Sequence, residues 1–311
     1  MISGLGLLSR RHMMRSMSAA LVGVGALASG GCARLIPQGL GLALTPSQIA
    51  DPVVFNFALN LEYLEAEYYA RGITGEGLSN DLLGPKPRGV LGGRKVNFAT
   101  PYIREFMAEI AEDERNHVRF LRQTIKASPL IELSRPAIDL QDSFRAAGAA
   151  AGLGDSFDPF ADEESFLLGA FIFEDVGVTA YAGAAKRVAD GLSIEAAAGI
   201  LAVEAYHAGI IRAQLAEMGS ATVAKANAIS AARDRLDGPE TTEVPLTDNG
   251  RIVISPTDGY GRAYPRTVQQ VLNVAYLTPG KDVKRGGFFP EGVNGIVRHS
   301  RYDTLDAGRL A

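Results

Sequence analysis

The sequence contains a Glu and a His three residues apart in two places. Glu114 and His117 lie in "EDERNHVRF", and Glu204 and His207 lie in "AVEAYHAGI". Residues at i and i+3 share one face of an α-helix, so each pair would point both side chains the same way. The chain has only four histidines, so the two pairs hold half of them. The spacing therefore predicts two helices that present ligands to one site.

Each of these segments follows a segment with a Glu and, seven residues later, a Tyr. Glu62 precedes Tyr69 in the first such segment, and Glu174 precedes Tyr181 in the second. The same order of motifs occurs twice, which indicates an internal repeat. An Arg also follows each histidine by five residues, at positions 122 and 212. We expect two similar halves, each supplying the same kinds of side chain.

Alanine-rich stretches and turn residues favour an all-α fold with four long helices. These helices are expected over residues 51–72, 101–127, 162–190 and 193–218. Asp51 suits the N-cap of the first, with Pro52 at its first position and Gly72 at its end. Ser193 suits the N-cap of the fourth. Shorter helices are expected near 142–152, 221–236 and 267–277.

The four long helices predict a bundle with the ligands near its middle. We expect one long crossover between its second and third helices, as in one class of four-helix bundles. Residues 128–161 are available for it, and at about 3.3 Å per residue they can span the length of the bundle.

The repeat supplies six candidate metal ligands: Glu62, Glu114, His117, Glu174, Glu204 and His207. Four carboxylates in an apolar bundle are costly unless cations offset them, because a buried unpaired charge is destabilising or takes up a proton. Mixed Glu and His ligation suits Fe or Mn, with Zn as an alternative by affinity. The same ligand set is found in di-iron and di-manganese bundles. The expected cofactors are therefore two divalent metal ions, Fe or Mn.

Glu65 is a rival ligand from the first helix, because it lies one turn beyond Glu62. The repeat aligns Glu62 with Glu174, and it aligns position 65 with Gly177, whose side chain can bind nothing. The repeat therefore favours Glu62 as the ligand and leaves Glu65 a supporting role.

Three other residues near the ligands leave alternatives open. Tyr69 and Tyr181 are either core aromatics or hydrogen-bond donors to a ligand carboxylate. Asp113 is either a solvated acid or the partner that orients a ligating His through its free ring N–H.

The overall composition is that of a soluble globular protein, with 47% hydrophobic and 21% charged residues. Lys and Arg number 31 against 35 Asp and Glu, and they are scattered, so nucleic acid is not an expected partner. Cys32 is the only cysteine, which excludes an internal disulfide.

Residues 1–35 are typical of an export signal, with Arg10 and Arg11 ahead of a short apolar run. The pattern resembles a twin-arginine signal. The run is short for a membrane span, which leaves a plain anchor as the lesser alternative. Cys32 lies where a lipoprotein is lipidated, although Ser29 departs from that pattern; the alternative is cleavage after Ala28. We expect a periplasmic or exported protein, either soluble or lipid-anchored.

Three segments, "FNFALNLEYLEAEYYARG", "EIAEDERNHVRFLR" and "GGFFPEGVNGIV", give the chain a family resemblance. It resembles the ferritin-like desiccation-related proteins of plants and their bacterial relatives over residues 48–300. The departures are Tyr68 before Tyr69, where relatives often have Phe, and the altered lipidation motif. The resemblance implies a ferritin-like four-helix bundle and an association with stress. It does not establish a reaction.

The expected organisation is a signal at 1–35, a ferritin-like bundle with an additional helix at 48–237, and a Gly/Pro-rich extension at 238–311. The extension contains "FFP", which is too apolar to leave in water, so we expect it to pack on the bundle.

Two functions of different kinds fit this sequence. In the first, the metal pair reacts with O2 or peroxide, as a ferroxidase or in peroxide detoxification, with no catalytic residue beyond the metal ligands. In the second, a stress-protective structural protein uses its metals only to stabilise the bundle. Iron storage in a cage is a weaker reading, because the long loops and the extension would crowd cage contacts. The sequence leaves open whether the chain forms a homo-oligomer.

Overall fold

The computed structural model describes residues 46–127, 133–238 and 242–300, and within them it contains seven α-helices. They are α2 (Pro46–Thr74), α3 (Pro101–Lys126), α4 (Asp142–Ala150), α5 (Glu163–Ala184), α6 (Gly191–Glu217), α7 (Ser220–Asp237) and α8 (Val268–Ala275). The strands have two residues each: β1 (Val90–Leu91), β2 (Ile138–Asp139), β3 (Thr247–Asp248) and β4 (Arg251–Ile252). Two 3-10 turns, η2 (Asn80–Leu82) and η3 (Ala185–Arg187), complete the described elements. The predicted all-α fold class is confirmed.

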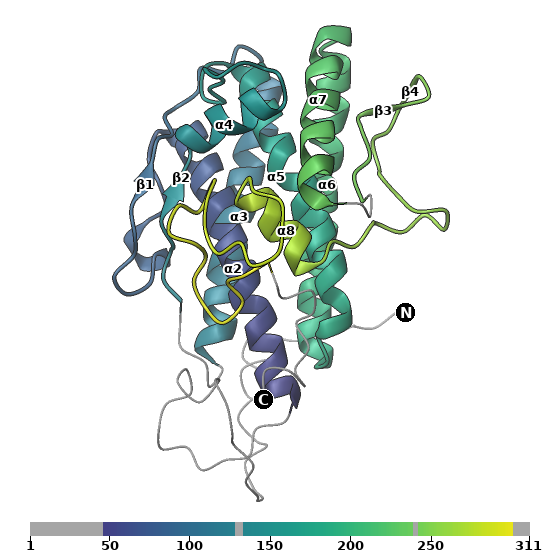
Figure 1. The fold of residues 1–311 in the computed structure, drawn as a ribbon. Coiled ribbons are helices and arrows are strands. Elements are labelled where there is room, and N and C mark those ends of the chain that lie inside the picture. The colour runs from purple at the N-terminus through teal and green to yellow at the C-terminus, as the bar shows by residue number, and fades with distance from the viewer. Residues whose placement is uncertain (1–45, 128–132, 239–241, 301–311) are drawn as a thin grey trace, which may run out of the picture.

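The long helices α2, α3, α5 and α6 run side by side (Figure 1), and contacts at their ends fix their directions. At one end, Thr100 before α3 donates two hydrogen bonds, at 2.9 and 2.8 Å, to Glu163 at the start of α5. At the other end, Asp51 of α2 accepts hydrogen bonds from the backbone just before α6. α3 and α5 therefore begin at the same end of the bundle.

The connection from α3 to α5 must consequently run the whole length of the bundle, as predicted. It carries β2 and α4. β2 pairs in parallel with β1 of the α2–α3 connection, with Val90 opposite Ile138. The α2–α3 connection and the α3–α5 connection therefore lie side by side, joined by this strand pair.

The start of α2 differs from the prediction. α2 begins at Pro46, so Asp51 and Pro52 lie inside the helix and do not begin it. The Asp51 carboxylate accepts hydrogen bonds of 3.0 and 2.9 Å from the backbone N–H groups of Ala189 and Asp190. Asp51 therefore holds a distant turn in place, a contact that the local sequence does not reveal.

The predicted end of α2 is also wrong. The helix continues through Gly72, where a β-carbon would collide with the ring of Phe166. Gly72 thus allows close packing on α5, and the chain leaves the helix at Gly75, whose φ of +89° favours glycine.

The junction between the last two long helices differs from the prediction as well. α5 ends at Ala184, earlier than expected. The side chain that caps α6 is Asp190, which accepts hydrogen bonds from the backbone of Leu192 and Ser193, so Ser193 is not the N-cap. Both residue types suit an N-cap, and the one nearer the observed start takes the role.

α5 and α6 are the most apolar of the long helices, and α5 is the more deeply buried of the two. Its most apolar window has a mean hydropathy of 1.3 and is 83% buried; α6 has a similar mean hydropathy of 1.4 but is 33% buried. By length and apolarity alone either helix could cross a membrane. Burial against neighbouring helices accounts for the composition of α5.

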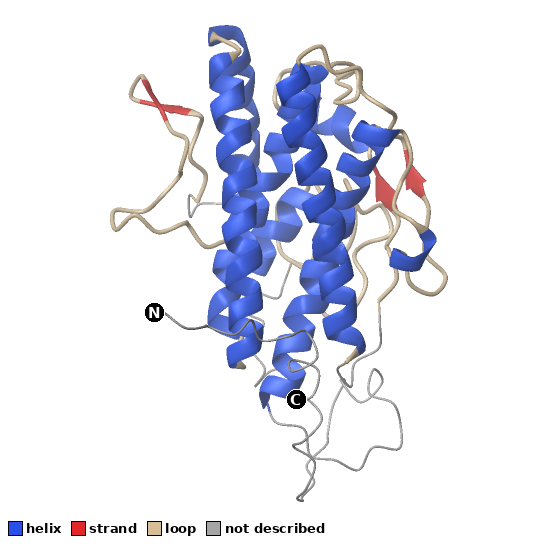
Figure 2. Cartoon of the chain, turned by 180° about the vertical axis from the view of Figure 1, so that it is seen from behind, coloured by secondary structure: helices blue, strands red, loops and turns tan. Residues whose placement is uncertain are grey.

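The described part of the extension packs on the bundle. α8 lies across the long helices in Figure 1 and contacts α5 and α7. Phe288 and Phe289 are buried, and the backbone N–H of Asn294 donates a 2.8 Å hydrogen bond to Asn60 of α2. The tip of the β3–β4 hairpin projects from the molecule (Figure 2), while hydrogen bonds between Thr247 and Asn227 tie its base to α7. The boundaries of the three expected segments stay predictions, and residues 1–35 lie outside the described residues.

Candidate metal centre

Each long helix carries one predicted carboxylate to the interior of the bundle. Glu62 of α2, Glu114 of α3, Glu174 of α5 and Glu204 of α6 are each at most 1% exposed. The histidines of the two Glu-x-x-His pairs are also buried. The structure therefore brings all six candidate ligands together.

These side chains form two groups in which the candidate ligand atoms lie within 4.8 Å of one another. One group contains Glu62, Glu114, His117 and Glu204, and the other contains Glu114, Glu174 and His207. Glu114 belongs to both groups. A carboxylate shared in this way lies between two places for a cation, which suits a dinuclear centre.

Both imidazoles turn their Nδ1 atoms toward the carboxylates. Nδ1 of His117 lies 3.1 Å from Glu62 Oε2 and 3.6 Å from Glu114 Oε2. Nδ1 of His207 lies 3.1 Å from Glu114 Oε1 and 3.4 Å from Glu174 Oε2. The two ring centroids are 6.3 Å apart. Each histidine thus faces the carboxylate of its neighbouring single-Glu helix as well as Glu114.

The two tyrosines of the repeat donate crosswise to ligand carboxylates. Tyr69 of α2 donates a 2.5 Å hydrogen bond to Glu174 of α5, and Tyr181 of α5 donates to Glu62 of α2. Each tyrosine therefore orients the carboxylate on the opposite helix. The sequence left this role open, and it gave no sign that the bonds would cross between the halves.

Asp113 interacts with the histidine of the other half. Its Oδ2 atom lies 3.4 Å from Nε2 of His207, while Nδ1 of that ring faces the carboxylates. A carboxylate on the outer nitrogen orients a metal-ligating imidazole. The equivalent position in the repeat is Val203, so this contact is not reproduced on the other side.

Glu65 is buried but belongs to neither group of candidate ligand atoms. Its counterpart in the repeat, Gly177, has no room for a side chain, because a β-carbon there would collide with Oε2 of Glu204. The same point lies 3.4 Å from Oε1 of Glu65. Glu65 therefore lies beside the site on the side where Gly177 leaves space.

The site has more acceptor atoms than donors. Both side-chain oxygens of Glu114 and Glu204, together with Glu174 Oε2 and His207 Nδ1, have no hydrogen-bond partner among the described residues. Buried polar atoms without partners are costly, and carboxylates are acceptors only when ionised. Divalent cations would satisfy these atoms. The residues present therefore fit a pair of such ions, and the buried cluster is compatible with divalent metal binding.

Electrostatics show how the site is arranged without cations. Burial raises the pKa of Glu62 to about 7 and raises that of Glu204 well above its usual value. Burial lowers the pKa of each histidine, but the facing carboxylates outweigh it and raise that of His117 to about 12 and that of His207 to about 11. Metal binding to these residues would therefore be in competition with protons.

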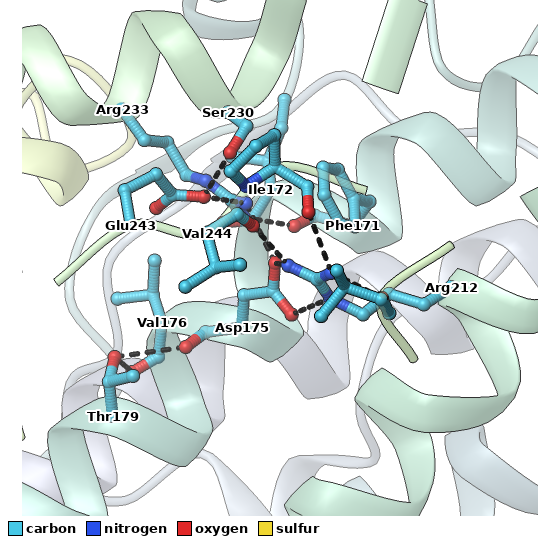
Figure 3. A network of polar contacts seen from close by, with 12 residues as sticks. Phe171, Ile172, Asp175, Val176, Thr179, Arg212, Ser230, Arg233, Glu243 and Val244 are labelled. Carbon is cyan, nitrogen blue, oxygen red and sulfur yellow. Dashed lines mark hydrogen bonds and ion pairs between the residues drawn. The ribbon is translucent and has the colours of Figure 1, made fainter. Parts of the chain in front are cut away.

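A second buried polar cluster, which we call the arginine network, begins one residue after Glu174 (Figure 3). Asp175 accepts two 2.9 Å hydrogen bonds from Arg212 and one of 2.7 Å from Arg233. Arg233 also donates to Glu243 at 2.5 Å, and Glu243 accepts from Arg266 at 2.5 Å. Arg266 in turn donates to Asp237 at 2.7 Å.

The arginine network joins the extension to the bundle. Glu243 and Arg266 lie in the extension, and Arg212 also donates to the backbone carbonyls of Val244 and Val253 at 2.6 and 2.8 Å. Sequence reasoning missed this cluster. The available signal was the Arg five residues after each histidine, but the partners of Arg212 are distant in sequence.

Comparisons with known proteins find ferritin-like relatives of this chain. Residues 50–217 match the sequence family described as a ferritin-like domain. The chain is 33% identical over 248 residues to the desiccation-related protein PCC13-62 of Craterostigma plantagineum, covering 72% of this chain and 76% of that protein. It is 30% identical over 280 residues to the ferritin-like catalase Nec2 of Nesocodon mauritianus, covering 80% and 85%. No solved structure matches the chain.

Proposed function

The chain belongs to the ferritin-like desiccation-related family, and on this premise we propose that it is a dinuclear Fe or Mn oxidoreductase that acts on O2 or peroxide in stress protection. The observation that carries the proposal is the sharing of Glu114 between two groups of candidate ligand atoms. The name of the catalase relative supports redox chemistry as the reason for such a site.

The proposed ligands are the six predicted residues, Glu62, Glu114, His117, Glu174, Glu204 and His207. When bound, a pair of Fe or Mn ions would supply one-electron chemistry at oxygen. Tyr69 and Tyr181 hold ligand carboxylates in place, and Asp113 orients His207. The surrounding core excludes bulk water, which strengthens the attraction between the carboxylates and the cations.

The test is metal loading followed by exposure to oxidant. Protein freed of metal is loaded anaerobically with Fe(II) or Mn(II), and the loss of hydrogen peroxide and the oxidation of the metal are followed. We expect both to require the loaded metal and to vanish in Glu114→Ala with Glu204→Ala. If the bound metals stay inert to O2 and peroxide while chelation lowers the melting temperature, the structural alternative is correct.

We also propose that the protein is exported through the twin-arginine route, because Arg10 and Arg11 precede a short apolar run. Replacement of both by Lys should retain the precursor in the cytoplasm, whereas normal export of that variant would indicate the general secretion route. Cys32→Ser tests lipidation: loss of membrane association supports a lipid anchor, and an unchanged soluble protein supports cleavage after Ala28.

A further inference from the structure

A small cavity lies between α2, α5 and α8. Its volume is about 30 Å³, and a water molecule needs about 10–15 Å³ measured in this way, so the cavity has room for a molecule of two heavy atoms. Among the described residues, Glu65 supplies the one charged side chain of its lining, and the others that line it are apolar or Gly177.

The inner end of the cavity touches the candidate metal centre. Gly177 lines the cavity, and the place where its β-carbon would be is occupied by Oε2 of Glu204. That carboxylate has no hydrogen-bond partner among the described residues. Any side chain at position 177 would therefore stand between the cavity and the ligands. Because position 177 is a glycine, the cavity reaches the carboxylate of Glu204 at the candidate metal centre.

The outer wall of the cavity comes from the extension. Val271 and Ala275 of α8, together with Phe288, line it and are nearly fully buried. The extension thus forms the wall of the cavity that lies opposite the metal centre, and the cavity is partly open. An apolar lining disfavours ions, which lose hydration on entering it, and admits small uncharged molecules.

We propose that this cavity is the access route by which a small uncharged oxidant, O2 or hydrogen peroxide, reaches the metal centre. Gly177 keeps its inner end open, and α8 sets the size of molecule that passes. The proposal rests on the proposed function, and it gives the extension a role in selecting the substrate.

Nitric oxide tests the route without any catalytic turnover. It is uncharged, has the size of O2 and binds Fe(II) with a change in absorbance, so its association with Fe(II)-loaded protein is followed by stopped flow. Ala275→Leu fills the cavity from α8 without touching a candidate ligand. Ala232→Leu is the matched control, because it fills a different cavity, between α4, α5, α7 and α8, that is lined by Arg233 and apolar residues and by no candidate ligand.

We expect Ala275→Leu to slow nitric oxide association about tenfold, as a modest added barrier does, and Ala232→Leu to leave it unchanged. Val271→Ala widens the cavity and is expected to speed association and to raise the rate with tert-butyl hydroperoxide relative to hydrogen peroxide. If Ala275→Leu does not fold, the rate of nitric oxide association with Val271→Ala tests the access route by itself.

The two proposals fail in different ways. If Val271→Ala and a folded Ala275→Leu both bind nitric oxide at the rate of the unchanged protein, the access route is overturned, whatever the protein catalyses. If those rates change as expected but neither O2 nor peroxide reacts at the loaded centre, the route stands and the proposed oxidoreductase function fails.

Discussion

Two buried polar clusters meet at consecutive residues of α5, and they differ in how their charge is compensated. Glu174 faces the candidate metal centre and Asp175 faces the arginine network. Burial raises the pKa of Glu174. Burial acts on Asp175 in the same direction, but Arg212 and Arg233 outweigh it and its pKa is lowered.

The difference lies in whether the protein itself supplies the compensating charge. The arginine network sets three buried arginines against three carboxylates, so the protein supplies both signs of charge itself. The candidate metal centre has carboxylate oxygens without partners and only two imidazoles to face them. Buried carboxylate oxygens that the chain leaves without partners are compatible with divalent cations.

Removal of two ligand carboxylates has the largest expected effect. Glu114 is shared between the two groups and Glu204 faces His117, so Glu114→Ala with Glu204→Ala should abolish metal binding. Elemental analysis after dialysis measures this, with Glu109→Gln on the exposed face of α3 as the control. If the double variant still bound two metal ions tightly, the proposed set of metal ligands would be wrong.

Two single substitutions on α2 distinguish the proposed ligand, Glu62, from the nearby Glu65. Glu62 lies in a group of candidate ligand atoms and Glu65 does not, so Glu62→Gln should lose at least one metal per chain. Glu65→Gln should keep both. Greater metal loss in the Glu65 variant would show that the alignment of the repeat is wrong.

The arginine network should respond in stability and not in metal content. Arg233 is buried against Asp175 and Glu243, and removing one partner of a buried ion pair costs about 3–5 kcal/mol. Arg233→Met should therefore lower the free energy of unfolding by that amount, measured by urea denaturation, while the folded variant still binds two metals. Arg235→Met, at an exposed position, is the control. A stable Arg233 variant that loses its metals would contradict the separation of the two clusters.

The pH dependence of the metal-free protein is a smaller effect. The pKa of Glu62 in the folded protein is about 7, above its ordinary value. Glu62 therefore makes its full contribution to the free energy of unfolding below about pH 4.5, and this contribution is lost as the pH rises through 7. The raised pKa values of His117 and His207 act in the same direction above about pH 6.5.

The melting temperature with chelator present should consequently fall between about pH 5 and about pH 8. Metal should restore it most at the higher pH, because fewer protons compete for the ligands. The lowered pKa of Glu114 has the opposite sign, but its window lies at more acidic pH. A metal-free protein that is more stable at the higher pH would refute this account of the site.

Local spacing was sufficient to find the six candidate ligands. The i, i+3 pairs and the repeat of single-Glu and Glu-x-x-His helices depend only on helix geometry, so they can be read along the chain. The alignment of Glu65 with Gly177 favoured Glu62 as the ligand, and Glu62 is the carboxylate that faces His117. Its role as a metal ligand stays a prediction.

Contacts between distant segments could not be predicted in the same way. Asp51 looks like a helix cap, yet its partners are the backbone groups of residues 189 and 190. Tyr69 and Tyr181 donate across the bundle, and Asp175 meets arginines from α6 and α7. These pairings depend on how the helices pack against one another. Helix packing leaves no short motif that can be recognised along one sequence.

The most direct test of the central claim is the number of metal ions bound per chain. Metal-free protein is titrated anaerobically with Fe(II) and, separately, with Mn(II), and tightly bound metal is counted by elemental analysis after gel filtration. Because Glu114 is shared between two groups of candidate ligand atoms, saturation is predicted at two ions per chain. Saturation at one ion, or no tight binding of either metal, would contradict the dinuclear centre.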